Sequence, residues 1–169
     1  MISSSEDLAK FIYCCGIFEE RVAKAYEHMS KLIEDATIAC FLAFIAHESF
    51  KHADCLRRIS KLIYGDLKID HKECEGILGE VFKSIMIDIE KVLNMECISH
   101  HDLASVIEGL ERIEGFAAEE YLTILQIRLV ELMAESLKLN INYLKTLLEW
   151  IVEDEKRHES ILKIIKNFL

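Results

Sequence analysis

The sequence contains no proline and only six glycines among its 169 residues. Proline lacks a backbone donor and glycine is conformationally free, so both residues weaken helix interiors. Little in this chain therefore interrupts long helices. Hydrophobic residues make up 51% and charged residues 30% of the sequence, and they recur with helical spacing rather than alternating as in a strand. The sequence predicts an all-α protein, and its length predicts a single domain over residues 1–169.

Positive charge is scarce, because 20 lysines and arginines stand against 30 aspartates and glutamates, for a net charge of −10. Nucleic acids and anionic membranes select clustered basic surfaces, so we expect neither as a partner. No uncharged apolar run reaches the roughly 18 residues of a membrane span. The N-terminal MISSSEDLAKF has the pattern of a helix start rather than a targeting segment. We therefore expect a cytoplasmic protein, with metal cations among its partners.

None of the six cysteines is spaced as C-x-x-C. This absence excludes the signature of a rubredoxin or zinc-ribbon module. Cys15, Cys40 and Cys55 lie among aliphatic residues, so we expect them to be small core residues rather than redox centres or metal ligands.

Capping signals divide the chain into five predicted helices. Serine and aspartate accept hydrogen bonds from free N–H groups at a helix start, and glycine readily ends a helix. The first predicted helix runs from Ser4 or Ser5 to about Ile33, and the second runs from the cap Asp35 to Tyr64, just before Gly65. The third begins at the Asp70–Glu73 capping box and ends at about Met95. The fourth begins at Ser99 and Asp102 and ends at about Met133, and the fifth runs from between Ser136 and Asn140 to the C-terminus.

The predicted connections define an arrangement for these helices. The loops after the first and the fourth helix are only a few residues long, so each loop joins an antiparallel hairpin. The third helix is long enough to carry the chain from one end of the molecule back to the other. These connections predict a four-helix bundle with an additional helix as the crossover between the two hairpins.

Each apolar stripe of the four predicted core helices is interrupted by polar residues. Counting from the two hairpin turns places these interruptions at one depth, whereas Glu114 would miss it by about six residues, or roughly 9 Å. Buried carboxylates are costly unless they are compensated, and a shared cation compensates several of them together. Carboxylate and imidazole ligands suit iron or manganese, with zinc as a substitute. The interrupting residues are Glu19, Ser49 with His52, Glu120, and Glu155 with His158.

This pattern resembles the ferritin-like superfamily of di-iron carboxylate proteins, and especially its rubrerythrin-like members. In such proteins two helices each supply one glutamate and two others each supply Glu-x-x-His. Glu155 and His158 match that motif in full, Glu19 with Tyr26 resembles the first-helix ligand and its neighbouring tyrosine, and Glu120 matches by position. The resemblance implies peroxide or dioxygen reduction, or ferrous oxidation, with a separate protein as electron donor. Bundles of this kind commonly dimerise, so a homodimer is a candidate assembly.

The chain departs from the family pattern in the second helix. Ser49 stands where the motif requires glutamate, and Glu48, one residue away, either reaches the site from the flank or faces a neighbouring helix or solvent. The lost carboxylate leaves two further readings open. The protein either holds one ion without turnover, or it is a metal-free scaffold whose Glu/His layer fixes the register of the helices.

Other polar residues have simpler expected roles. Tyr26 is either a core aromatic or a proton carrier beside the site. The remaining histidines near helix starts or off the stripes are expected at the surface; they are His47, His71, His100 and His101.

Overall fold

The computed structural model describes residues 4–98, 100–118 and 141–169, and within these ranges the regular structure is entirely helical. The prediction of an all-α protein is therefore confirmed. The five described helices are α1 (Ser5–Leu32), α2 (Ala36–Tyr64), α3 (His71–Leu93), α4 (His100–Phe116) and α6 (Ile141–Phe168).

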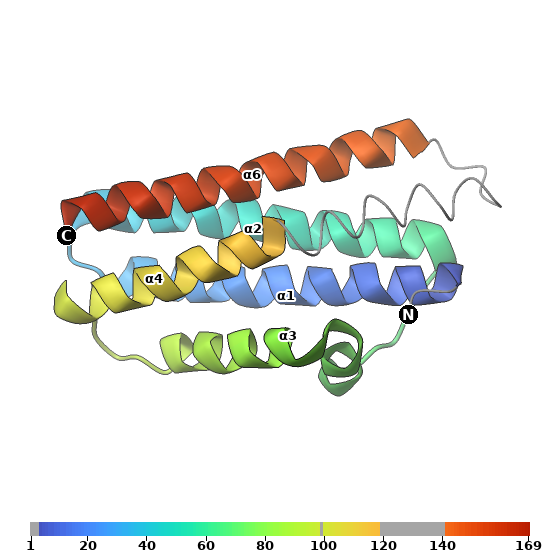
Figure 1. Ribbon diagram of the computed structural model, residues 1–169, viewed down its shortest axis with the longest axis horizontal. Helices are drawn as coiled ribbons and strands as arrows, with labels where there is room; N and C mark the ends of the chain where they lie inside the picture. The colour runs from blue at the N-terminus through green and yellow to red at the C-terminus, as the bar shows by residue number, and fades with distance from the viewer. Residues whose placement is uncertain (1–3, 99, 119–140) are drawn as a thin grey trace.

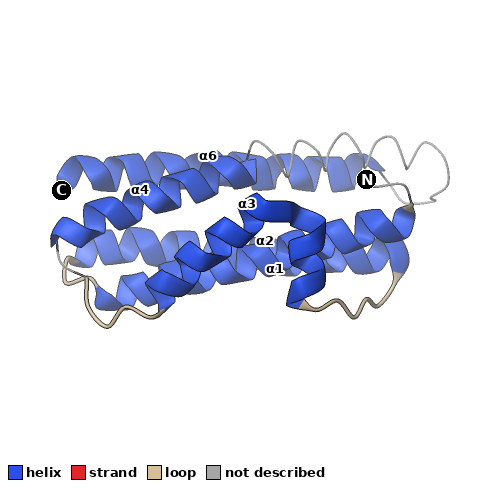
Figure 2. Ribbon diagram, turned by 60° about the horizontal axis from the view of Figure 1, so that its bottom comes forward, coloured by secondary structure: helices blue, strands red, loops and turns tan. Residues whose placement is uncertain are grey.

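Four of the helices, α1, α2, α4 and α6, lie lengthwise beside one another, and α3 follows the outer side of α1 (Figures 1 and 2). Helix α1 packs against α2, α4 against α6, and α2 against α6. Helices α1 and α6 run in one direction and α2 and α4 in the other (Figure 1). Buried aliphatic and aromatic side chains from all five helices form one core, which surrounds the few polar groups described below.

The predicted capping residues begin and end the first helices. The side chains of Ser4, Asp35 and Asp70 each accept a hydrogen bond from a backbone N–H in the first turn that follows. Gly65 ends α2 with φ of 97°, a conformation that side chains with a Cβ rarely adopt. These starts and the end of α2 confirm the sequence prediction, because caps act within a single turn.

Helix α3 is predicted as one uninterrupted helix to about Met95. Its end at Leu93 agrees with this prediction, but its continuity does not, because Gly79 has φ of 83° and ψ of −167° and separates a short first segment from the rest of the helix. Glycine alone has ready access to this backbone conformation. The helical hydrophobic pattern continues on both sides of Gly79, so it did not indicate this break.

The later helix boundaries are only partly described. Helix α4 ends at Phe116, and Ala117 and Ala118 continue it as a wider π turn. The predicted continuation to Met133, the cap Ser99 and the start of the last helix lie outside the described residues. Among the helices that the structure describes, none combines the length and the hydropathy that a membrane span requires.

A disulfide joins Cys14 of α1 to Cys74 of α3, across 60 residues of sequence. No spacing or motif in the sequence indicates this pair. Cys15 is buried as predicted and Cys55 is half-buried, but the prediction of a core position for Cys40 is wrong, since it is exposed. Disulfides are typical of oxidising compartments and of intracellular proteins from hyperthermophiles, so the cytoplasmic location stays a prediction.

Close packing between α1 and α2 fixes the relative position of their polar residues. A Cβ atom on Gly16 would lie 3.1 Å from the carbonyl oxygen of Ala53. Gly16 precedes Glu19 by three residues, and Ala53 follows His52 directly. The two backbones therefore approach closely beside Glu19 and His52, the two side chains predicted to share a cation.

Candidate metal centre

The buried core contains a small set of polar side chains among its apolar ones. Glutamates and histidines of this set come from α1, α2, α4 and α6, and each has less than 5% of its surface exposed. Burying such groups without partners costs several kcal/mol, on the order of the stability of a domain. The set consists of Glu19, Ser49, His52, Glu114, Glu155 and His158, together with the remote Ser60.

The side chains form two groups that share one carboxylate. Glu19, His52 and Glu155 place one ligand atom each within 4.8 Å of one another, and so do Glu114, Glu155 and His158. The Oε1 atom of Glu155 lies 2.8 Å from Nδ1 of His52, and its Oε2 atom lies 3.6 Å from Nδ1 of His158. Glu155 is therefore placed to bridge two neighbouring ions.

Unpaired atoms in this layer fit a bound cation. Ser49 Oγ, His52 Nδ1 and Glu155 Oε1 are buried and have no hydrogen-bond partner among the described residues. Although Nδ1 of His52 and Oε1 of Glu155 are close, they are not aligned as a hydrogen bond. A cation bound between His52 and Glu155 would need these two atoms close together and not hydrogen-bonded to each other. Oxygen and imidazole ligands suit iron, manganese or zinc.

The outer nitrogen of each histidine faces a carboxylate. Nε2 of His52 donates to Asp154 at 3.0 Å, and Nε2 of His158 lies 3.4 Å from Glu48. Histidines that bind metals usually donate their second N–H to such a partner, which fixes the ring and its tautomer. Glu48 thus supports His158 from outside and belongs to neither ligand group. Sequence reasoning missed Asp154, although it directly precedes Glu155 in the motif.

Two positively charged side chains, those of Lys51 and Arg157, contact these outer carboxylates on the side of the layer toward the surface. Lys51 Nζ lies 3.1 Å from Glu48 and 3.2 Å from Asp154. Arg157 lies 3.3 Å and 2.8 Å from the same two carboxylates. Lys51, Arg157, Glu48 and Asp154 form a charged cluster over the two histidines, which we call the outer cluster.

Glu114 is part of the layer, so the interpretation that excluded it is wrong. Its carboxylate accepts a hydrogen bond from the Tyr26 hydroxyl and lies 3.2 Å from Nδ1 of His158. The count from the turn assumed a regular α-helix, whereas α4 gives way to a π turn after Phe116 and is inclined to α1 and α2 (Figure 1). Glu120, the residue predicted in its place, lies outside the described residues.

Burial and neighbouring charge shift the acid–base behaviour of the layer. Burial, with the neighbouring Glu155, raises the pKa of Glu19 well above its usual value and that of Glu114 to about 8. Burial opposes ionisation of Glu155, but His158 and His52 hold its pKa below the usual value. Burial also opposes the charge on His158, yet Glu114 and Glu155 raise its pKa to about 11.

These pKa shifts arise because the layer contains more buried carboxyl groups, on Glu19, Glu114 and Glu155, than histidines to pair with them. Burial raises the pKa of Tyr26 as well, and the adjacent Glu114 adds to the effect. Without a cation, burial therefore favours the protonated forms of Glu19 and Glu114, because it raises the pKa of both. A divalent cation would displace such protons, because metal ligands bind in their deprotonated forms.

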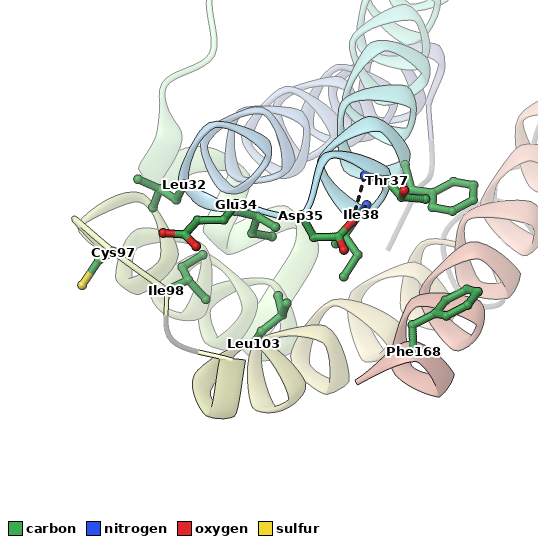
Figure 3. Close-up of a pocket in the computed structure, with 11 residues that line it drawn as sticks. Leu32, Glu34, Asp35, Thr37, Ile38, Cys97, Ile98, Leu103 and Phe168 are labelled. Atoms are coloured by element: carbon green, nitrogen blue, oxygen red, sulfur yellow. Dashed lines mark hydrogen bonds between the residues drawn. The ribbon is translucent and has the colours of Figure 1, made fainter.

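A pocket of about 420 Å³ lies elsewhere, at the end of the molecule where α1 joins α2 (Figure 3). Its lining includes Ile38, Leu103 and Phe168 and is largely apolar. The Asp35 carboxylate beside it is engaged in capping α2 through Thr37 and Ile38 (Figure 3). None of the residues of the buried layer lines this pocket.

The remaining histidines are placed in part. His47 is exposed, as predicted, and its ring bonds to the carbonyl of Ala43. The side chains predicted at the surface for His71, His100 and His101 lie outside the described ones.

The chain matches no protein-family model, no curated protein and no solved structure. The resemblance to ferritin-like proteins therefore stays a prediction from the sequence.

Proposed function

We propose that the protein is a ferritin-like, rubrerythrin-like metal protein that holds iron in the buried layer. The expected reaction is reduction of peroxide or dioxygen, or oxidation of ferrous iron, with electrons from a separate donor protein. In this proposal α1, α2, α4 and α6 form the ferritin-like bundle, and α3 is the crossover helix. One observation supports it above all others: buried carboxylates and imidazoles from four helices converge on the shared Glu155.

Each residue of the layer has a role that follows from its contacts. Glu19 and His52 would bind on one side of Glu155, and Glu114 and His158 on the other. Bound iron would supply the redox step by changing between its ferrous and ferric states.

The contacts around the ligands support the same proposal. Tyr26 orients Glu114 through its hydroxyl. The outer cluster places a carboxylate beside the outer nitrogen of each ring, which would orient both rings as ligands.

A second candidate function is metal binding without turnover. Ser49 removes one carboxylate from the pattern, so fewer charges remain to hold a second ion. The protein would then hold a single iron, manganese or zinc ion for metal handling or for stability. The number of ions bound per chain separates this candidate from the first.

The test is anaerobic reconstitution with ferrous iron, followed by removal of loosely bound metal and elemental analysis. We expect two ions per chain, and oxygen-dependent bleaching of the ferrous signal. Glu155→Gln should abolish binding of at least one ion, because both ligand groups use this carboxylate. Glu153→Gln, an exposed change in the same helix, is the matched control. Binding of less than one ion per chain would reject the proposal, and one ion without bleaching would favour the second candidate.

Thermal stability distinguishes these two metal-binding functions from a scaffold whose polar layer binds no metal. A metal that binds only the folded state must raise the melting temperature. We expect chelation to lower it. An unchanged melting temperature on chelation, together with no metal in the purified protein, would identify the scaffold.

A further inference from the structure

A polar cavity separate from the buried layer lies between α1, the end of α2 and the loop that follows α2. The end of α2 lies beside the start of α1 (Figure 1). The cavity has a volume of about 250 Å³, and a water molecule takes about 30 Å³, so there is room for several waters or for one small ligand. We call it the Arg57 cavity. It is lined by Tyr13, Arg57, Ser60, Lys61, Gly65, Asp66 and Leu67.

Arg57 has a buried hydrogen-bond donor without a partner. Its Nε atom is shielded from solvent and bonds to no described residue, whereas its Nη2 atom donates to Glu20 of α1. The side chain passes close to Gly16, since a Cβ atom there would lie 3.1 Å from the Cγ atom of Arg57. A buried donor without a partner is unfavourable and rare in folded proteins. The cavity that Arg57 lines has space for a partner that the protein does not supply.

The charges of the lining favour an anion as that partner, although the net charge of the protein is −10. Arg57 and Lys61 both line the cavity and lie four residues apart, on one face of α2. The acidic lining residue is Asp66, which pairs with Lys61 at 2.7 Å. Both side chains of this pair are largely exposed, so the pair contributes little to stability. An anion in the cavity could therefore contact Lys61 at small cost.

We propose that the Arg57 cavity binds a phosphate group, either as inorganic phosphate or as part of a small phosphorylated metabolite. Arg57 donates to a phosphate oxygen through its Nε–H group, and Lys61 adds a second positive charge. Arginine suits this ligand, because its planar guanidinium matches the geometry of phosphate oxygens. The proposal is independent of the proposed function, since the cavity shares no residue with the two ligand groups of the metal layer.

The experiment is calorimetric titration of the complete 169-residue chain with inorganic phosphate. Metal is first removed with a chelator, which is then dialysed away, because metal in the buried layer could itself bind phosphate. Sodium chloride at matched ionic strength is the reference, since general screening acts in both salts. We expect saturable binding of one phosphate per chain and no saturable binding of chloride.

A parallel titration with glycerol 3-phosphate distinguishes the two sources of the phosphate group. Tighter binding of this ester than of inorganic phosphate would support a phosphorylated metabolite as the ligand. Equal or weaker binding of the ester would support the free ion.

Two matched substitutions test the assigned donor. Arg57→Lys keeps the positive charge and removes the Nε–H group, so it should weaken phosphate binding by about tenfold or more, as expected for a lost hydrogen bond between charged groups. Arg58→Lys is the control, because Arg58 is exposed, pairs with Asp54 and does not line the cavity. It should leave phosphate affinity unaltered.

A further variant keeps the test decisive if Arg57→Lys does not fold. Lys61→Gln alters an exposed side chain and should weaken phosphate binding by about two- to fivefold, the effect of one exposed charge. Unaltered affinity in Lys61→Gln would then overturn the proposal.

The outcomes are separate from those for the metal layer. Absence of saturable phosphate binding by the unaltered chain would overturn the proposal and leave the cavity to water alone. Equal phosphate affinity in Arg57→Lys and Arg58→Lys would also overturn it, because binding would then not use the Nε–H group. Neither result bears on the proposed function, which is tested by metal stoichiometry.

Discussion

The segments 49–52 of α2 and 155–158 of α6 occupy matching positions beside the buried layer, but their histidines have different surroundings. Both ring nitrogens of His158 lie near carboxylates, at 3.2 Å from Glu114 and 3.4 Å from Glu48. His52 donates to Asp154 outside, while its inner nitrogen has no hydrogen-bond partner among the described residues. The two rings stack with centroids 5.9 Å apart. The histidine of the complete motif has a carboxylate near each ring nitrogen, whereas the histidine of the incomplete motif has an inner nitrogen without a hydrogen-bond partner among the described residues.

The sharpest test of this difference is removal of each ring from the metal-free protein. His158→Ala leaves Glu114 without its histidine partner and Glu155 with His52 alone, so we expect a loss of about 3–5 kcal/mol in the free energy of unfolding. His52→Ala removes fewer satisfied contacts and should cost about 1–3 kcal/mol. Urea unfolding in the presence of chelator measures both values. Equal losses would show that the two motifs are equivalent.

Removal of the disulfide tests whether the different surroundings of His52 and His158 depend on the covalent link between α1 and α3. The double change Cys14→Ser and Cys74→Ser opens a closed loop of 60 residues, which should cost about 4 kcal/mol. Metal stoichiometry should stay the same, since no cysteine belongs to either ligand group. Cys40→Ser, at an exposed free thiol, should change stability by less than about 0.5 kcal/mol. A changed stoichiometry in the double variant would tie the metal layer to the α3 connection.

Changes in the outer cluster compare the supports of the two rings. Asp154→Asn and Glu48→Gln should each lower metal affinity by about 10- to 100-fold, because outer partners fix the orientation of a histidine ligand. We expect Asp154→Asn to have the larger effect, since its bond to His52 is 3.0 Å against 3.4 Å between Glu48 and His158. Competition with a chelator of known affinity measures both. Wild-type affinity in both variants would reject the assigned role.

The smallest expected effect concerns Tyr26, whose hydroxyl donates to Glu114 on the satisfied side. Tyr26→Phe preserves the packing of this fully buried ring and removes one hydrogen bond, so we expect a loss of about 1 kcal/mol. Metal stoichiometry should remain unchanged in elemental analysis. A lost ion would instead show that Tyr26 holds Glu114 in its binding position.

The parts of the site that sequence reasoning found are those with a local signal. Glu19, His52, Glu155 and His158 each interrupt an apolar stripe, and all four are buried in the layer. The hairpin of α1 and α2 could be aligned by counting, because its turn is short and bounded by the cap Asp35. The same count was wrong for Glu114, since it extended over a long stretch in which the helix was assumed to be regular.

Other features had no local signal at all. The Cys14–Cys74 disulfide joins residues far apart in sequence, and only the path of α3 brings them together. Asp154 lies within a run of charged residues on α6, so nothing in the sequence marks its contact with His52.

The sequence by itself determined the helical class, the helix starts at Ser4, Asp35 and Asp70, and the polar breaks in the apolar stripes. These features depend on interactions within one or two helical turns. Only the tertiary structure decided that Glu114 joins Glu155 and His158, that Glu48 stays outside, and that the Ser49 hydroxyl has no partner among the described residues. The physical reason is that the relative depth and tilt of packed helices depend on contacts between distant segments, which helical periodicity does not encode.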